Sequence, residues 1–177
     1  MVDLTVVILT KNEEKNLRKC VESFRGIVKR FVIVDSFSTD ETENLCRQLD
    51  AELKVFGASL DFYQNEWISY ADQLNWGLQN TSITTAWSMR MDADEELTEE
   101  LSREIDEKLT TIKEPVNGII LRRRVYFMGR WIKHGGRYPE LLLRIFRTGK
   151  AMCEQKLMDE HMILSEGTTT IFQYDLI

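Results

Sequence analysis

A strand that ends in a run of acids is the most informative stretch of the chain: Trp87-Ser88-Met89-Arg90-Met91-Asp92-Ala93-Asp94-Glu95-Glu96. Its first half alternates apolar and polar side chains, the pattern of a strand with one apolar face. Asp92 and Asp94 follow two residues apart, so in an extended chain both carboxylates point the same way. Two such charges repel unless a cation separates them, and Mg²⁺ or Mn²⁺ suits carboxylate and phosphate oxygens. The stretch predicts either a metal site or a solvated acidic turn.

The length and composition indicate one globular domain. The chain has 177 residues, of which 43% are hydrophobic and 29% charged, values that are ordinary for a soluble protein with a sizeable core. No apolar run reaches the roughly 20 residues that span a bilayer, and the first residues do not resemble a signal peptide. Cys20, Cys46 and Cys153 lack the spacing of metal ligands, so we expect reduced, packed thiols in a cytoplasmic protein.

The net charge of −6 conceals a basic segment. Between Ile119 and Lys150 there are nine Lys or Arg residues and one acid, Glu140, so this segment carries +8 and the remainder −14. Such a segment could bind phosphate, anionic lipid or an acidic acceptor. Equally, it could be a solvated surface that balances an acidic half.

Strand and helix patterns alternate through most of the chain. Short apolar runs predict parallel strands at 4–9, 31–34, 52–56 and 87–91. Apolar residues at helical spacing predict helices near 17–24, 45–49 and 64–80, and another after Thr98, which is expected to cap it. Asn12 and the segment Ser38–Glu41 are expected to cap the first and second helices. Beyond Glu114-Pro115, strands are expected at 118–127 and 141–147. The pattern predicts an α/β fold with a mostly parallel sheet and a short antiparallel C-terminal part.

Polar and acidic residues directly follow three of the predicted strands: Thr10-Lys11-Asn12-Glu13, Asp35, and Asp92-Ala93-Asp94. In open α/β sheets, ligands bind at the edge formed by the carboxyl ends of the parallel strands. Residues that are distant in the sequence therefore converge, and the two aspartates are no longer an isolated pair.

Other ligand sites are excluded by the absence of their motifs. The chain has neither the glycine pattern of a dinucleotide fold nor a P-loop, and it lacks the G-x-S-x-G of serine hydrolases. A calcium loop starting at Asp92 would need Gly and Glu where the chain has Leu97 and Arg103. The remaining chemistry is metal-assisted binding of a nucleotide or phosphate without a glycine loop.

Several motifs follow one another in a distinctive order: Thr10-Lys11-Asn12-Glu13-Glu14, Val32-Ile33-Val34-Asp35-Ser36-Phe37-Ser38-Thr39-Asp40, Met91-Asp92-Ala93-Asp94-Glu95, Gly135-Gly136-Arg137-Tyr138-Pro139-Glu140, Leu143-Arg144-Ile145-Phe146-Arg147, and Asp159-Glu160-His161. This order resembles family 2 glycosyltransferases with the GT-A fold, and it is similar to bacterial enzymes that add a hexose to lipopolysaccharide core or related surface glycans. The resemblance runs from about Leu4 to His161. It implies a Rossmann-like, three-layer GT-A domain over residues 1–177, with the nucleotide sugar on 1–112 and the acceptor on 113–177.

The activity that the resemblance implies is an inverting, metal-dependent transfer of a hexose. The donor would be a nucleotide diphosphate sugar, expected to be UDP-linked, and the acceptor a surface glycan, lipopolysaccharide core or lipid-linked glycan. Mg²⁺ or Mn²⁺ is the implied cofactor. No nucleic-acid partner is expected, and the cytoplasmic protein would touch the inner membrane surface at most peripherally.

On the donor side, the resemblance assigns roles position by position. Thr10, Asn12 and Glu13 would line the nucleotide pocket, and Asp35 would hydrogen-bond the base. On the metal side, Asp94 would bind the cation that bridges the donor diphosphate, while Asp92 would contact the ribose or the metal. On the acceptor side, Glu160 is the first choice and Asp159 the second for the base that deprotonates the attacking hydroxyl.

Three features depart from the family pattern. Gln73-Leu74 stand where relatives often carry a basic residue, so the phosphate contact is expected either to be missing or to come from Arg144 or Arg147. Asp159 stands where relatives usually have His. Relatives also continue beyond the segment that ends here at Ile177, so the acceptor half is expected to be either trimmed or naturally short.

Two other functions stay open on sequence alone. A sugar-nucleotide nucleotidyltransferase usually has a loop rich in Gly, Lys and Arg after its first strand, and Thr10-Lys11-Asn12-Glu13 is not such a loop. A truncated, non-catalytic domain would share the donor motifs and bind a nucleotide sugar, but it would transfer nothing.

Overall fold

Strands and helices alternate through the first four β-strands of the computed structural model, which describes residues 1–24, 26–156 and 160–177. These elements are β1 (Val2–Thr10), α1 (Leu17–Ser23), β2 (Val28–Asp35), α2 (Thr42–Lys54), β3 (Ser59–Gln64), α3 (Tyr70–Asn80), β4 (Trp87–Asp92) and α4 (Glu99–Lys108). A 3-10 turn, η1 (Leu109–Thr111), leads to β5 (Val116–Arg123), β6 (Tyr126–Phe127), β7 (Arg130–Trp131), β8 (Glu140–Arg147), β9 (Ala151–Cys153), β10 (Met162–Leu164) and β11 (Thr168–Leu176).

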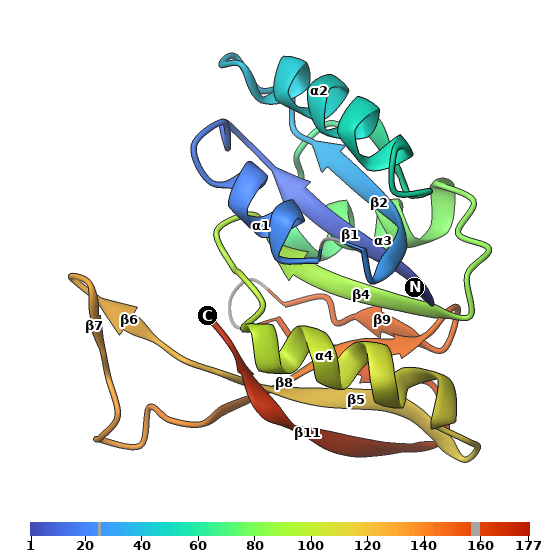
Figure 1. Cartoon of the computed structure of the whole chain (residues 1–177), viewed down its shortest axis with the longest axis vertical. Helices are drawn as coiled ribbons and strands as arrows, with labels where there is room; N and C mark the ends of the chain where they lie inside the picture. Colours follow the sequence, from blue (N-terminus) through green and yellow to red (C-terminus); the bar gives the residue numbers. More distant parts are fainter. Residues whose placement is uncertain (25, 157–159) are drawn as a thin grey trace.

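The central sheet has the strand order β11-β5-β8-β4-β1-β2-β3 (Figure 1). β1 pairs in parallel with both β2 and β4, β2 with β3, and β5 with β11. Among these described strands, β8 alone runs antiparallel to its neighbours, β4 and β5. The predicted α/β fold with a mostly parallel sheet is therefore confirmed. Residue 112, where the boundary between the two halves is expected, falls between η1 and β5: the strands before it (β3, β2, β1, β4) and after it (β8, β5, β11) occupy the two sides of one sheet.

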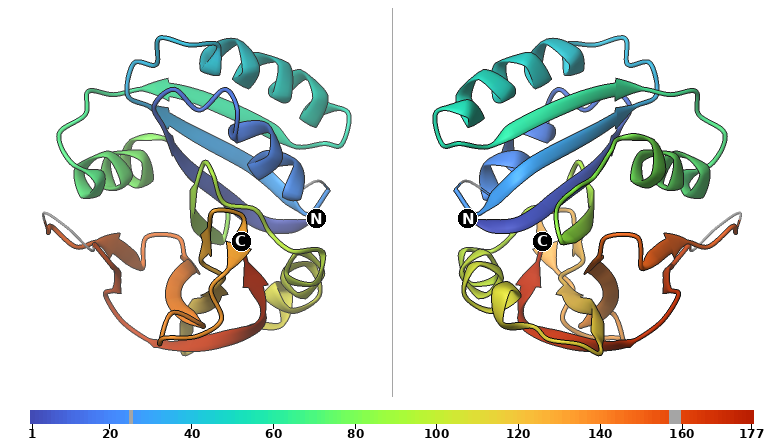
Figure 2. Two further views of the ribbon diagram at one scale, coloured as in Figure 1. Left: turned by 90° about the vertical axis from the view of Figure 1, so that its left-hand side faces the viewer. Right: turned by 90° about the vertical axis from the view of Figure 1, so that its right-hand side faces the viewer.

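The molecule has three layers because β1 and its neighbours bury side chains on both faces. Leu4, Val6 and Ile8 pack with apolar residues of α1, α2 and α4 on one face. Val7 packs on the opposite face with residues of α3 and the β9–β10 hairpin. Figure 2 shows helices on both sides of the strands. Burial of both faces explains why β1 reads as a continuous apolar run.

Helix α3 approaches the sheet closely at a single glycine. A Cβ atom added to Gly77 would lie 2.8 Å from Val34 Cγ2 and 3.3 Å from Val7 Cγ1. The missing side chain lets the helix lie against the two strands whose carboxyl ends carry the polar loops.

Several element boundaries differ from the expectation, among them that of the strand expected at 118–127, which ends at Arg123 before the short β6. The strand expected at 52–56 is wrong: α2 continues to Lys54 because Leu53 extends its buried stripe, and β3 begins only at Ser59. The caps expected at Asn12 and Ser38–Glu41 are also wrong, since α1 begins at Leu17 and α2 at Thr42. The predicted helix 64–80 starts later, at Tyr70, with Ser69 as its cap.

The last strand, β11, was not predicted from the sequence, and a side chain of α4 holds it in place. Glu104 is 3% exposed, and its carboxylate accepts hydrogen bonds from the backbone N–H groups of Gln173 and Tyr174 at 2.9 and 3.1 Å. These N–H groups lie where the pairing of β11 with β5 changes register. The helix thus supplies hydrogen bonds that the neighbouring strand does not.

Two further expectations concern cysteines and membrane segments. Cys20, Cys46 and Cys153 are free and buried, as predicted. In the described ranges, no helix combines the length and the apolar character that crossing a bilayer requires.

Candidate functional site

The loops after β1 and β2 are joined side by side at the carboxyl edge of the sheet. The Asn12 backbone N–H donates to Ser38 Oγ at 2.8 Å, and the Thr39 N–H donates to Asn12 Oδ1 at 2.8 Å. The Glu13 N–H donates to Thr42 Oγ1 at 2.9 Å. Asn12 has φ 60°, a conformation that Asn tolerates better than most residues, so its side chain can bridge the loops. The predicted convergence of these two loops is therefore present.

Asp35 is the residue that holds the two loops together. It is 0% exposed, and its carboxylate accepts hydrogen bonds from Thr10 Oγ1 at 2.8 Å and from the Ser38 N–H at 2.8 Å. Ser38 Oγ donates to the same carboxylate. Oδ2 accepts only one of these hydrogen bonds and keeps a lone pair, so the base contact expected of Asp35 stays a prediction.

An exposed aromatic residue lies beside Asp35 that the sequence did not single out. Phe37 is 52% exposed and has φ 58°, which is uncommon for a bulky residue. Lys11 Nζ donates to the Phe37 carbonyl oxygen at 2.7 Å and to that of Ser36 at 2.8 Å, which fixes the loop. A flat apolar ring is thereby presented at the edge of the loop pair.

Asp92 ends β4 with its carboxylate already surrounded by donors. Tyr70 Oη donates to Asp92 Oδ1 at 2.6 Å, and Arg144 Nη2 donates to Oδ2 at 3.2 Å. Arg90 Nη2 lies 3.7 Å from Oδ2. Burial raises the pKa of Asp92, but the two guanidinium groups and the Tyr70 hydroxyl outweigh it and hold the pKa below its usual value. Asp92 is therefore ionised and internally neutralised.

Glu95 shares the same arginine, and the sequence did not single it out. Its side chain is 7% exposed, and it accepts hydrogen bonds from Arg144 Nη2 at 2.5 Å and from Arg123 Nη1 at 3.2 Å. Glu95 Oε2 also accepts from the Asp92 backbone N–H at 3.1 Å. Burial and the neighbouring charge of Asp92 raise the pKa of Glu95 despite these cations. One guanidinium nitrogen thus serves two carboxylates.

Arg144 is buried behind the acidic stretch. Its side chain is 1% exposed, and β8 places it behind Asp92 and Glu95. Its Nε and Nη1 atoms are buried and have no hydrogen-bond partner among the described residues. In this conformation Arg144 supports the acidic stretch from inside the protein, and the expected phosphate contact stays a prediction.

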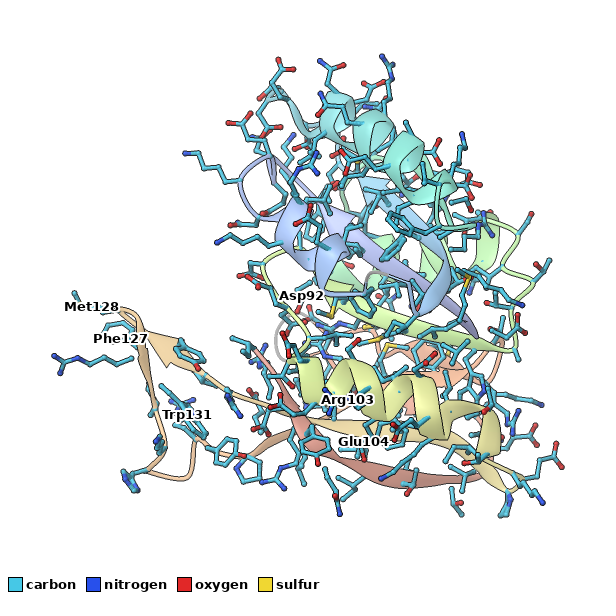
Figure 3. The ribbon with its side chains drawn as sticks, viewed as in Figure 1. Asp92, Arg103, Glu104, Phe127, Met128 and Trp131 are labelled. Carbon is cyan, nitrogen blue, oxygen red and sulfur yellow. The ribbon has the colours of Figure 1, made fainter. Side chains whose placement is uncertain are left out.

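Asp94 differs from Asp92 in being exposed and unengaged. Among the described residues, it takes part in no hydrogen bond or ion pair. A cavity of about 330 Å³ lies beside it, lined in part by Glu95, Arg123, Arg124 and Tyr126. In Figure 3, Asp92 marks the end of β4 on the side from which the β6–β7 hairpin extends.

Of the two candidate bases, Asp159 and Glu160, the structure describes only Glu160. Asp159 lies outside the described residues. Glu160 is half-buried, and its carbonyl oxygen accepts a hydrogen bond from Arg90 Nη1 at 3.4 Å. Because Arg90 also lies beside Asp92, this contact brings the Glu160 backbone to the acidic stretch.

The described residues contain no group of three or more His, Cys, Asp or Glu side chains arranged to hold a metal ion. Of the two aspartates of the motif, Asp94 has a free carboxylate and lies next to the neutralised Asp92. Such a donor set suits a Mg²⁺ or Mn²⁺ ion whose remaining ligands come from phosphate and water.

The sequence profile described as "Glycosyl transferase family 2" matches residues 5–173. The chain belongs to this family. It is 32% identical over 106 residues to an uncharacterized glycosyltransferase of Rickettsia felis, a match that covers 60% of this chain and 34% of that protein. It is 30% identical over 95 residues to the glycosyltransferase SunS of a Bacillus subtilis prophage, covering 51% and 20%. The matched part thus spans about a third or less of these relatives.

Solved structures support the fold of this family 2 member. Staphylococcus aureus TarS 1–349 in complex with UDP-GlcNAc aligns with a TM-score of 0.54 and 19% identity, covering 84% of this chain and 46% of TarS. The Pyrobaculum calidifontis mannosyltransferase PcManGT, in complex with GDP-Man and Mn²⁺, aligns with a TM-score of 0.56 and 19% identity, covering 82% and 44%. The GT-A fold expected from the sequence is confirmed.

Proposed function

We propose that the protein transfers a hexose from a UDP-linked sugar to a surface-glycan, lipopolysaccharide-core or lipid-linked acceptor, with inversion and with Mg²⁺ or Mn²⁺. The observation that carries the proposal is the contrast within one motif: Asp94 is exposed and unengaged, while Asp92 beside it is neutralised. In a solvated acidic turn, both aspartate side chains would be exposed to water. Membership of a glycosyl transferase family and the structure of TarS with UDP-GlcNAc support a nucleotide-sugar donor.

The donor nucleotide would bind the joined loops after β1 and β2. Thr10, Asn12 and Glu13 belong to one loop, and Phe37 offers its exposed ring from the other. Stacking on an aromatic ring contributes roughly 1–3 kcal/mol per base. In this scheme Asp35 holds the loops together and hydrogen-bonds the base, and the Phe37 ring stacks on it.

The metal would be held by Asp94, with Asp92 beside it to contact the ribose or the ion. When bound, a divalent cation would neutralise the charge that grows on the departing nucleoside diphosphate. The protein itself would keep Asp92 ionised and fixed through Tyr70 and Arg144, so that the two carboxylates face the donor in a defined arrangement.

The acceptor hydroxyl would be deprotonated by Glu160, with Asp159 as the alternative base. The resulting oxygen nucleophile would attack the anomeric carbon from the side opposite the leaving nucleoside diphosphate, which inverts that carbon. Arg90 connects the two halves of this arrangement, because it contacts the Glu160 carbonyl and lies beside Asp92.

Product analysis tests this proposal. The chain is incubated with UDP-hexose, Mn²⁺ and a lipid-linked or oligosaccharide acceptor, and the nucleotide product is identified by chromatography. We expect UDP and a β-linked hexose from an α-linked donor, with Glu160→Gln retaining donor binding but losing transfer. In a parallel incubation with pyrophosphate in place of the acceptor, formation of UTP and hexose 1-phosphate from UDP-hexose would indicate a nucleotidyltransferase instead. Donor binding without any transfer would indicate a non-catalytic domain.

A further inference from the structure

Residues 124–139, here called the arm, extend away from the body of the molecule between β5 and β8 (Figures 1 and 3). β6 and β7 form its two-stranded end, in which Tyr126 pairs with Trp131 and Phe127 with Arg130. Met128 and Gly129 connect them with φ 50° and 73°, the two positive values that a tight hairpin turn requires.

The tip of the arm exposes large apolar side chains. Met128 is 87% exposed and Phe127 67%, the highest values for a Met and a Phe in the described residues, and Tyr126 is 44% exposed. A two-stranded hairpin has no second layer that could cover these side chains. Their burial therefore requires something outside the arm.

The rest of the arm is cationic and contains no acid. The sequence 124–139 has four Lys or Arg residues and no Asp or Glu, so the arm carries +4 in a chain of net −6. Arg124 is paired with Asp175, but Arg130, Lys133 and Arg137 are exposed and form no ion pair among the described residues. These charges are free to meet an external anion.

Trp131 joins the apolar tip to the cationic part. Arg124 Cζ and Lys133 Nζ lie 4.5 and 4.4 Å from the centroids of its ring system, and the ring of Tyr138 meets it edge-on at 5.0 Å. Apolar side chains at a tip, with Trp, Tyr and cations behind them, match the layers of an anionic membrane surface: hydrocarbon, headgroup and phosphate.

We propose that the arm docks on an anionic phospholipid bilayer, with Phe127 and Met128 inserted between the headgroups and Arg130, Lys133 and Arg137 paired with lipid phosphates. The base of the arm lines the cavity beside Asp94, so docking would turn that cavity toward the membrane. The inference deepens the proposed function, because a lipid-linked acceptor would lie in the same surface. Lipid binding does not depend on sugar transfer and can be tested separately from it.

The test is sedimentation of the whole chain with vesicles of phosphatidylcholine alone or mixed with phosphatidylglycerol. We expect binding to the mixed vesicles, weakening as salt rises, and at least about tenfold weaker binding of the tip variant Phe127→Ser/Met128→Ser. The variant Arg130→Gln/Lys133→Gln should lose the preference for the anionic lipid.

Matched controls separate the arm from general surface properties. Val55 is 82% exposed on another part of the molecule, so Val55→Ser should bind vesicles like the wild type. Arg103→Gln/Lys113→Gln removes two exposed charges outside the arm and should also leave binding unchanged. The proposal is overturned if the wild type ignores anionic vesicles, if the tip variant binds equally well, or if ultracentrifugation shows a dimer that the tip variant loses. Failure of transfer with intact vesicle binding would instead count against the proposed function.

Discussion

Arg144 places one guanidinium nitrogen between the buried carboxylate of Glu95 and the half-buried carboxylate of Asp92, and this arrangement sets the chemistry of the acidic stretch. Without the cation, Asp92 and Glu95 would be left as neighbouring acids in a poorly solvated site. We expect Arg144→Met to lower the free energy of unfolding by about 3–5 kcal/mol, measured by urea denaturation. Arg103→Met, at an exposed position on α4, is the control; equal losses in the two variants would show that Arg144 has no such role.

The raised pKa of Glu95 predicts a pH dependence of stability. Above the ordinary value of 4.5, the unfolded chain loses the Glu95 proton while the folded protein still holds it. The Glu95 contribution to the free energy of unfolding therefore falls as the pH rises from 4.5 to the raised pKa. The lowered pKa of Asp92 acts below its ordinary value of 3.8, outside this window.

Urea denaturation of the wild type and of Glu95→Gln at several pH values from 4.5 upward checks this sign. The difference in free energy, wild type minus variant, should decline with rising pH. A difference that grows instead would mean that Arg144 and Arg123 lower the pKa of Glu95.

At the scale of single elements, the side chain of Glu104 fastens β11 to α4. Glu104→Ala removes the acceptor of the Gln173 and Tyr174 N–H groups, and we expect a loss of about 1–3 kcal/mol in urea denaturation. Glu107→Ala removes an exposed acid from the same helix and should cost little. Similar losses for both variants would show that the Glu104 carboxylate does not hold β11.

The sequence predicted the elements whose patterns are local. β1, β2 and β4 are apolar runs followed by polar residues, so the sheet edge that carries Asn12, Asp35 and Asp94 could be predicted. β11 was missed although Thr168–Tyr174 is rich in the β-branched and aromatic residues that favour strands. Its parallel pairing with β5 and its contact with Glu104 depend on the fold and could not be predicted. The role of Arg144 was also hidden, since it depends on β8 entering the sheet beside β4.

At the scale of the whole molecule, the arm and the joined loops are separate parts with separate tasks. The tip residues Phe127 and Met128 do not line the cavity beside Asp94. The variant Phe127→Ser/Met128→Ser should therefore bind UDP with Mn²⁺ as tightly as the wild type, by calorimetry. A loss of nucleotide affinity in this variant would mean that the arm closes over the donor.

Calorimetric titration of UDP, with and without Mn²⁺, tests the assignment of Asp94 most directly. The wild type should bind UDP only when Mn²⁺ or Mg²⁺ is present, because the free Asp94 carboxylate would otherwise repel the diphosphate. Asp94→Ala should abolish this metal dependence, while Glu96→Ala, two residues further along, should retain it. UDP binding that needs no metal and is unchanged in Asp94→Ala would contradict the assignment of Asp94 as the metal ligand.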